Sequence, residues 1–166
     1  MASTHVARQS ISVVRETVQS YADRGVFRAF NEAAARNGTA EFRFLWFPIT
    51  NEPFRLVFSE KTNTLTFRNL LQQMPAKSEQ YAELRKFVKE RCSQELREHR
   101  RIDADKADVK CSNRGGNFSL SLKVAGNHHE YGVRKAVNLV NDIFMDLLQE
   151  STYYEYMQEH FDLPEE

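Results

Sequence analysis

The sequence predicts an α+β domain in which a five-stranded antiparallel sheet packs against N-terminal, central and long C-terminal helices. The sheet consists of a three-strand meander followed by a hairpin. Apolar and polar residues alternate in short runs within Phe42–Arg68 and again within Val109–Val124, which is the two-residue period of strands. Within Tyr131–Phe161 apolar residues recur every three or four positions, as on one face of a helix. The 166 residues are expected to form a single domain, residues 1–166.

The N-terminal region, from Val6 to about Asn37, is predicted to be helical in two pieces. The first piece carries one apolar line, formed by Ile11, Val14, Val18 and Tyr21. Gly25 interrupts the helix, because glycine costs about 1 kcal/mol relative to alanine in a helix interior. The apolar pattern resumes at Val26, and we interpret Asn37-Gly38 as the left-handed cap that ends the second piece.

Three strands of a meander are predicted over residues 42–47, 54–59 and 64–68. Pro48 and Pro53 mark the first turn, because proline cannot donate to a strand ladder, and residues 60–63 form the second. Both faces of this meander carry apolar residues. Those on the face expected to point outward are Leu45, Phe47, Ile49 and Val57. We therefore expect this outer face to be partly covered, by the N-terminal helices or by a partner.

A central helix is predicted to begin at Ser78 and to extend to about Arg101. Its buried line is expected to comprise Tyr81, Leu84, Phe87, Val88, Cys92 and Leu96. A polar linker over residues 103–108 follows, and then a hairpin whose turn is Asn113–Asn117 with its two glycines. Its second strand, Phe118–Val124, has the cleanest alternation in the chain.

The last helix, Tyr131–Phe161, would be roughly 45 Å long if unbroken, whereas a chain of this length forms a body only about 40 Å across. Either the helix bends near Ser151-Thr152, or its aromatic end reaches beyond the body. Tyr153, Tyr154 and Tyr156 cannot all face one core. They are expected to serve an interface or to pack locally onto the N-terminal helices.

Composition excludes several classes of function. Lys+Arg and Asp+Glu are both 23, so no global field favours nucleic acid or an anionic membrane. No stretch reaches the roughly 18 consecutive apolar residues of a membrane span, and the N-terminus has no secretion signal pattern. We expect a cytoplasmic protein that binds neither nucleic acid nor membrane. Cys92 and Cys111 are expected to be reduced core thiols.

The chemical motifs favour structural roles. His128-His129-Glu130 is interpreted as a solvated turn at a helix start rather than a metal site, because no third ligand follows at helical spacing. Arg114–Asn117 precedes a strand, so it is a hairpin turn and not a phosphate loop. Glutamates interrupt the basic run Arg91–Arg101, which indicates a solvated helix face. No nucleophile motif is found. We therefore expect no catalytic residue, no metal and no cofactor.

The order of helix, meander, helix, hairpin and helix resembles the type III secretion chaperone-like fold, which includes the YbjN-like proteins. The matching segments are Phe42–Arg68, Ser78–Arg101, Val109–Val124 and Tyr131–Phe161. The resemblance implies a small, cytosolic, non-enzymatic and often homodimeric protein that binds an extended segment of a partner. Secretion chaperones tend to be acidic, whereas this chain is neutral and has a longer N-terminal helical region.

Two functional hypotheses follow. The first is a protein-interaction module and homodimer. Its predicted partner-binding residues are Leu45, Phe47, Ile49, Val57, Tyr153 and Tyr156. The second is a small-molecule binder or enzyme that uses a cavity between the sheet and the last helix. The residues expected to line that cavity are Phe44, Trp46, Phe118, Leu120, Ile143 and Phe144. A filled core would favour the first hypothesis, and an empty cavity the second.

Overall fold

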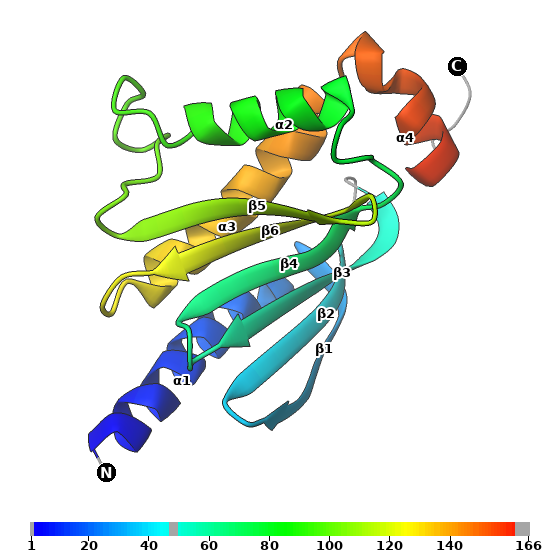
Figure 1. Cartoon of the computed structure of the whole chain (residues 1–166). Coiled ribbons are helices and arrows are strands. Elements are labelled where there is room, and N and C mark those ends of the chain that lie inside the picture. The colour runs from blue at the N-terminus through cyan, green and yellow to red at the C-terminus, as the bar shows by residue number, and fades with distance from the viewer. Residues whose placement is uncertain (1, 47–49, 162–166) are drawn as a thin grey trace.

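The computed structural model describes residues 2–46 and 50–161, which fold into one six-stranded sheet with four α-helices (Figure 1). The strand order is β1-β2-β3-β4-β6-β5, and every neighbouring pair is antiparallel. The antiparallel α+β prediction is confirmed, but the strand number is six and not five. The helices are α1 (Ala2–Asp23), α2 (Glu79–Glu90), α3 (His129–Asp142) and α4 (Tyr154–Phe161). The strands are β1 (Phe27–Arg36), β2 (Thr39–Trp46), β3 (Thr50–Ser59), β4 (Thr64–Leu71), β5 (Ala107–Arg114) and β6 (Asn117–Val124).

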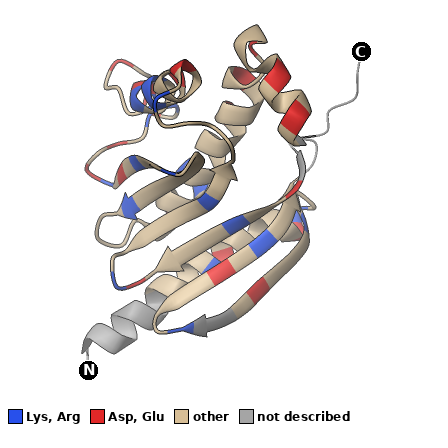
Figure 2. Cartoon of the chain, turned by 45° about the vertical axis from the view of Figure 1, so that its right-hand side comes forward, with Lys and Arg blue, Asp and Glu red and all other residues tan. Residues whose placement is uncertain are grey.

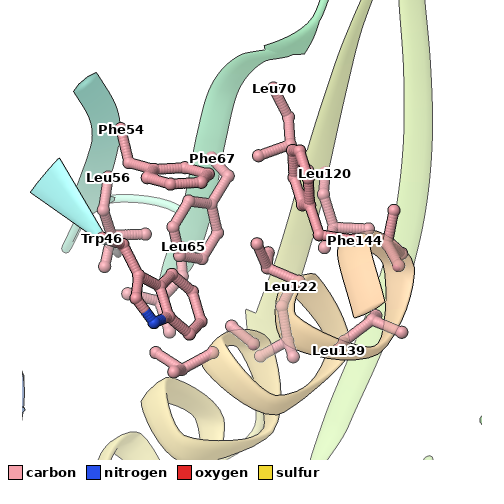
Figure 3. Close-up of a cluster of buried hydrophobic side chains, with 14 of the residues drawn as sticks. Trp46, Phe54, Leu56, Leu65, Phe67, Leu70, Leu120, Leu122, Leu139 and Phe144 are labelled. Atoms are coloured by element: carbon pink, nitrogen blue, oxygen red, sulfur yellow. The ribbon is translucent and has the colours of Figure 1, made fainter. Parts of the chain in front are cut away.

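The helices α1 and α3 lie side by side on one face of the sheet and bury its aromatic side (Figure 1). A single hydrophobic core joins all of these elements. At its centre Phe54 of β3 contacts Phe67 of β4 and Phe144, which follows α3, with edge-to-face ring centroids 6.3 and 5.7 Å apart (Figure 3). Aromatic pairs of this kind contribute about 0.5–1.5 kcal/mol beyond their buried area.

The extra strand is β1, where the sequence predicts the second piece of the N-terminal helix. That prediction is wrong. The aromatic rings of Phe27 and Phe44 stack with centroids 3.9 Å apart, so β1 is held by its packing on β2. Asn37 and Gly38 both have positive φ, 52° and 73°, and they join the paired residues Arg36 and Thr39 as a two-residue hairpin turn. The dipeptide that was interpreted as a helix cap is therefore a strand turn.

The meander has the predicted alternation, but β3 begins earlier than expected, at Thr50. The register between β2 and β3 shifts after the Phe44–Phe54 pair, so Pro53 lies in a bulge, where a missing N–H costs little. β3 pairs with β4 only from Leu56 to Ser59. Beyond that point the two strands diverge (Figure 2). A cleft of about 270 Å³ lies between them, and we call it the notch between β3 and β4.

The central helix α2 begins where the sequence predicts, because the Ser78 side chain accepts a hydrogen bond from the Tyr81 amide at 3.1 Å. It ends at Glu90 and not near Arg101. Residues 91–106 instead form a loop, closed where the Ile102 amide donates to the Arg91 carbonyl at 2.9 Å. Ile102 is buried there, which gives the loop an anchor in the core.

The predicted hairpin is confirmed as β5 and β6, with Gly115 and Gly116 in the turn at positive φ. The C-terminal helix is broken near Ser151-Thr152, which is one of the two alternatives that the sequence predicts. After α3 the chain makes a wide helical turn over Ile143–Leu147, becomes extended at Glu150, and resumes as α4 after Ser151–Tyr153. The aromatic end therefore folds back onto the body (Figure 1).

Candidate functional site

Of the four apolar residues predicted on the outer face of β2 and β3, the two that the structure describes are buried or partly buried. Val57 is only 6% exposed and Leu45 is partly buried, whereas Phe47 and Ile49 lie outside the described residues. Val57 is paired across the strands with Glu41 and Thr66. The expectation that the N-terminal helices cover this face is wrong, because α1 packs on the opposite face with α3.

The buried tyrosines of the C-terminal segment pack locally and not onto the N-terminal helix: Tyr153 contacts α2, and Tyr156 contacts the segment that follows β4. Tyr153 is fully buried, and its hydroxyl donates to the Gln80 carbonyl at 2.9 Å. Tyr156 is 6% exposed, and its hydroxyl donates to the Gln72 carbonyl. Burial raises the pKa of both phenols. The prediction that Tyr153 and Tyr156 contact a partner does not fit these buried positions; Tyr154 is the exposed tyrosine.

The His128-His129-Glu130 segment is not fully solvated as the sequence predicts. His129 is 6% exposed and packs edge-to-face on Phe58 with ring centroids 5.7 Å apart. Its Nε2 lies 2.6 Å from Oδ1 of Asn63, whose amide nitrogen donates to the Val124 carbonyl. The pair therefore ties the β3–β4 turn to the end of β6. Among the described residues no group of three or more His, Cys, Asp or Glu could hold a metal ion.

The space between the sheet and α3 is occupied by side chains. The residues expected to line a cavity there are each at most 5% exposed: Phe44, Trp46, Phe118, Leu120, Ile143 and Phe144. They belong to the same core cluster, so these positions act as packing residues.

A broad surface cleft lies between α2 and β5, and we call it the α2–β5 groove. Its volume is about 650 Å³, within the range typical of binding clefts. Its lining residues come from α2, the loop 91–106 and β5. They are Ala82, Arg85, Lys86, Val88, Lys89, Cys92, Ile102, Ala104, Ala107, Asp108, Val109, Lys110 and Cys111. The floor is apolar, and the rim carries four cations against one carboxylate.

One wall of this groove is a sheet edge. β5 is the last strand in the sheet order, so its backbone groups that point away from β6 face no strand. Its pairing with β6 is regular over eight residues, from Ala107 to Arg114, without a register shift. Val109 and Cys111 point to the helix-covered side but remain partly exposed, whereas Lys110 is exposed on the other side. Lys and Arg mark both α2 and β5 in blue (Figure 2).

Both cysteines lie in the groove, and both are free thiols, partly buried. Burial raises the pKa of Cys111 to about 11, although nearby Arg85 opposes the shift. Burial also raises the pKa of Cys92. Thiols with raised pKa values remain protonated at neutral pH and are weak nucleophiles. The groove is therefore equipped for contact and not for thiol chemistry.

The sequence analysis did not identify this groove. Its signals were present separately: the basic positions Arg85, Lys86 and Lys89 on one helix, and the apolar positions Val109 and Cys111 on one strand. Only their placement opposite each other makes a site. Two smaller clefts exist elsewhere: the notch between β3 and β4, of about 270 Å³, and a basic cleft of about 200 Å³ between α3 and the loop 91–106.

Comparisons with models of protein families, with curated proteins and with solved structures find no match for this chain. Among the described residues no helix combines the length and apolar character that a bilayer crossing requires. Function is therefore inferred from the clefts, charges and strand edges of the chain itself.

Proposed function

We propose that this chain is a non-enzymatic protein-interaction module that binds an extended segment of a partner in the α2–β5 groove. The observation that carries the proposal is the regular, unpaired edge of β5 beside an apolar floor. An added strand gains main-chain hydrogen bonds from such an edge, and alternate side chains reach into the neighbouring groove. No surface residue is required to act as a nucleophile or a base.

The charges of the groove specify the segment further. Arg85, Lys86 and Lys89 of α2 and Lys110 of β5 form the rim, against the single carboxylate of Asp108. A segment in which apolar and acidic residues alternate would place its apolar side chains beside Val109 and Cys111, and its carboxylates on the opposite face of the sheet, beside Lys110. The cations of α2 would attract such a segment over a longer distance. Complementary charge chiefly supplies selectivity and a faster association rate.

The order of elements also supports this function. The predicted resemblance to type III secretion chaperone-like and YbjN-like proteins depends on a helix, a meander, a helix, a hairpin and a final helix. The chain has that order with one further strand, β1, before the meander. Partner binding without catalysis, in the cytoplasm, is what this resemblance implies.

The alternative of a small-molecule site beneath α3 has less support, because side chains such as Phe44 and Phe144 occupy that space. A second copy of this chain is the other candidate occupant of the β5 edge, as the homodimer prediction requires. Antiparallel pairing of two β5 edges would bring two basic rims together, so charge favours an acidic partner segment. Light scattering across a concentration series tests the dimer.

The decisive experiment is an NMR titration of the ¹⁵N-labelled chain with an eight-residue peptide of alternating Val and Glu. We expect shifts confined to β5, α2 and the loop 91–106. The matched peptide of alternating Val and Lys should bind more weakly. Replacement of Lys86 or Lys110 by Glu should weaken binding of the acidic peptide about threefold to tenfold at low salt, with less effect at high salt.

Lys61→Glu is the matched control, because Lys61 is an exposed lysine in the β3–β4 turn, outside the groove. It should leave peptide binding within about twofold, an effect of less than 0.5 kcal/mol. Equal binding of the Val-Lys peptide, or shifts confined to the notch between β3 and β4, would refute the proposal. Concentration-dependent dimerisation through β5 would identify a second copy as the occupant instead.

A further inference from the structure

The basic cleft lies on the other side of the loop 91–106 from the α2–β5 groove, and nothing in the proposed function uses it. It is formed by α3 and the loop, with buried Leu139 and Ile102 among its lining residues. Arg91, Arg100 and Lys135 also line it, with the imidazole of His99, whereas Asp142 is its single carboxylate. Its volume of about 200 Å³ limits an occupant to a small molecule or chemical group.

Lys135 is held in place from α3. Its Nζ donates to the His99 carbonyl at 3.0 Å, which joins the helix to the loop. An ammonium has three N–H donors, and this bond uses one of them. Burial lowers the pKa of Lys135, whereas the nearby Asp103 carboxylate raises it. A partly buried cation in such a position is stabilised when an anion binds beside it.

Carboxylates balance part of the positive charge of the cleft, because Asp103 lies near Lys135 and Arg91 has two acidic neighbours. Arg91 lies 3.8 Å from Oδ2 of Asp142 and 3.4 Å from Oδ2 of Asp146, so its charge is partly balanced. Arg100 is exposed, and within the described part of the chain its guanidinium makes no hydrogen bond or ion pair; its charge attracts the Asp142 carboxylate. Two amides, Asn138 and Asn141, add hydrogen-bond donors to the lining.

From this arrangement we infer that the basic cleft binds a phosphoryl group, as inorganic phosphate or as the phosphate of a small metabolite. A guanidinium fork, an ammonium and amide donors together match the several acceptor oxygens of a phosphate, and exceed what a two-oxygen carboxylate can use. A divalent cation is disfavoured, because the one carboxylate is already next to Arg91. The small size of the cleft argues against nucleic acid, and so do the glutamates that interrupt the basic run Arg91–Arg101.

The test is an NMR titration of the full chain with inorganic phosphate at constant ionic strength, with sodium acetate as the reference anion. We expect saturable shifts at α3 and the loop 91–106 with phosphate, and weaker ones with acetate. A second arm uses glycerol 3-phosphate: tighter binding than phosphate assigns the site to a phosphorylated metabolite, and equal or weaker binding assigns it to free phosphate. Either result supports the inference.

Variants separate the site from general surface charge. Arg100→Gln should weaken phosphate binding about tenfold, the value of one charge-assisted hydrogen bond, and it should leave the fold intact because the Arg100 side chain is exposed. Lys135→Gln should do the same, and Lys135→Arg should retain most of the binding. Arg97→Gln is the control, because Arg97 is exposed on the same loop but does not line the cleft.

One further variant has the opposite sign. Asp142→Asn removes the carboxylate that competes with phosphate for Arg91, so it should tighten phosphate binding. The control Asp105→Asn, in the loop 91–106 but outside the cleft lining, should leave binding unchanged. Shifts that do not saturate, an Arg97→Gln effect equal to that of Arg100→Gln, or equal binding of acetate would overturn the inference. These results would leave the α2–β5 groove and its peptide test untouched.

Discussion

The two edges of the sheet are built differently. β1 has register shifts between Arg28 and Asn31 and between Ala33 and Arg36, and Ala29 has a φ of 50°. Such irregular edges resist the addition of another strand. β5 has no shift over its eight paired residues. The contrast indicates that the chain blocks one edge and leaves the other competent for pairing.

The inward side chains of the two edge strands differ in the same sense. Phe27 of β1 is 2% exposed and stacks on Tyr21 of α1 as well as on Phe44. On β5 the corresponding residues Val109 and Cys111 are only partly buried, at the border of the core. β1 is therefore needed to complete the core, whereas β5 has apolar surface left for a ligand.

The largest test of this contrast is truncation of one inward side chain on each edge. Phe27→Ala should lower the free energy of unfolding by about 3–5 kcal/mol, because it removes a buried aromatic ring. Val109→Ala should cost less than about 1.5 kcal/mol, because its side chain is already partly hydrated. Urea denaturation followed by tryptophan fluorescence measures both. Equal costs would show that β5 is as much part of the core as β1.

The two edge hairpins give a smaller contrast. Gly38, at a φ of 73°, has no room for a Cβ, which would lie 2.8 Å from Cγ of Glu60. At Gly115, with a φ of 60°, a Cβ would meet nothing within 4 Å. Gly38→Ala should therefore destabilise by about 2–3 kcal/mol and Gly115→Ala by about 1 kcal/mol, both measured by denaturation. Similar values would mean that the Glu60 side chain simply moves aside.

A third test concerns the link between the two halves of the sheet at His129. Replacement of His129 by Ala should lower the free energy of unfolding by about 1–3 kcal/mol, because Oδ1 of Asn63 loses its hydrogen bond to the imidazole. A solvated turn, as the sequence predicts for His128-His129-Glu130, would instead leave stability nearly unchanged, which does not fit the buried position of His129. Thermal denaturation of the variant decides between the two.

The same residue predicts a pH dependence. Burial lowers the pKa of His129 below its ordinary value of about 6.5, although a backbone hydrogen bond at Asn127 opposes the shift. The unfolded chain therefore takes up a proton first as the pH falls. This contribution to stability is present above pH ~6.5 and is lost as the pH falls through the lowered pKa of the folded state. Between pH 7.5 and 5.5 the wild type should lose more stability than the His129→Gln variant; parallel curves would contradict the assignment.

The sequence predicted the elements whose local signals have one meaning. The period of two in Phe118–Val124, the glycine turn before it and the Ser78 cap each favour one structure, and all three are confirmed. The signals around Ala33 to Gly38 have two meanings, because alanine favours helices and Asn-Gly serves both helix ends and hairpins. The aromatic contact of Phe27 with Phe44, far away in the sequence, decided in favour of the strand.

The candidate sites were harder to predict than the fold. The alternation of residues predicted that Leu45 and Val57 face outward, but it did not show that Val57 would be buried between its cross-strand neighbours. The tyrosine cluster indicated a contact surface. Tyr153 and Tyr156 make their contacts within the chain, where their hydroxyls donate to the carbonyls of Gln80 and Gln72. Periodicity shows that a side chain is apolar and which side it faces, but not what lies opposite.

The sequence by itself determined the antiparallel α+β class and five of the six strands, and it reduced the last helix to two alternatives, of which the structure shows the bend near Ser151. These features follow from the spacing of apolar residues and from turn residues, which act over a few positions. Only the tertiary structure decided that β1 is a strand, that α2 faces β5 across a groove, and that Lys135 and Arg100 line the same basic cleft. Each of these depends on residues distant in sequence, whose encounter is set by packing of the whole core.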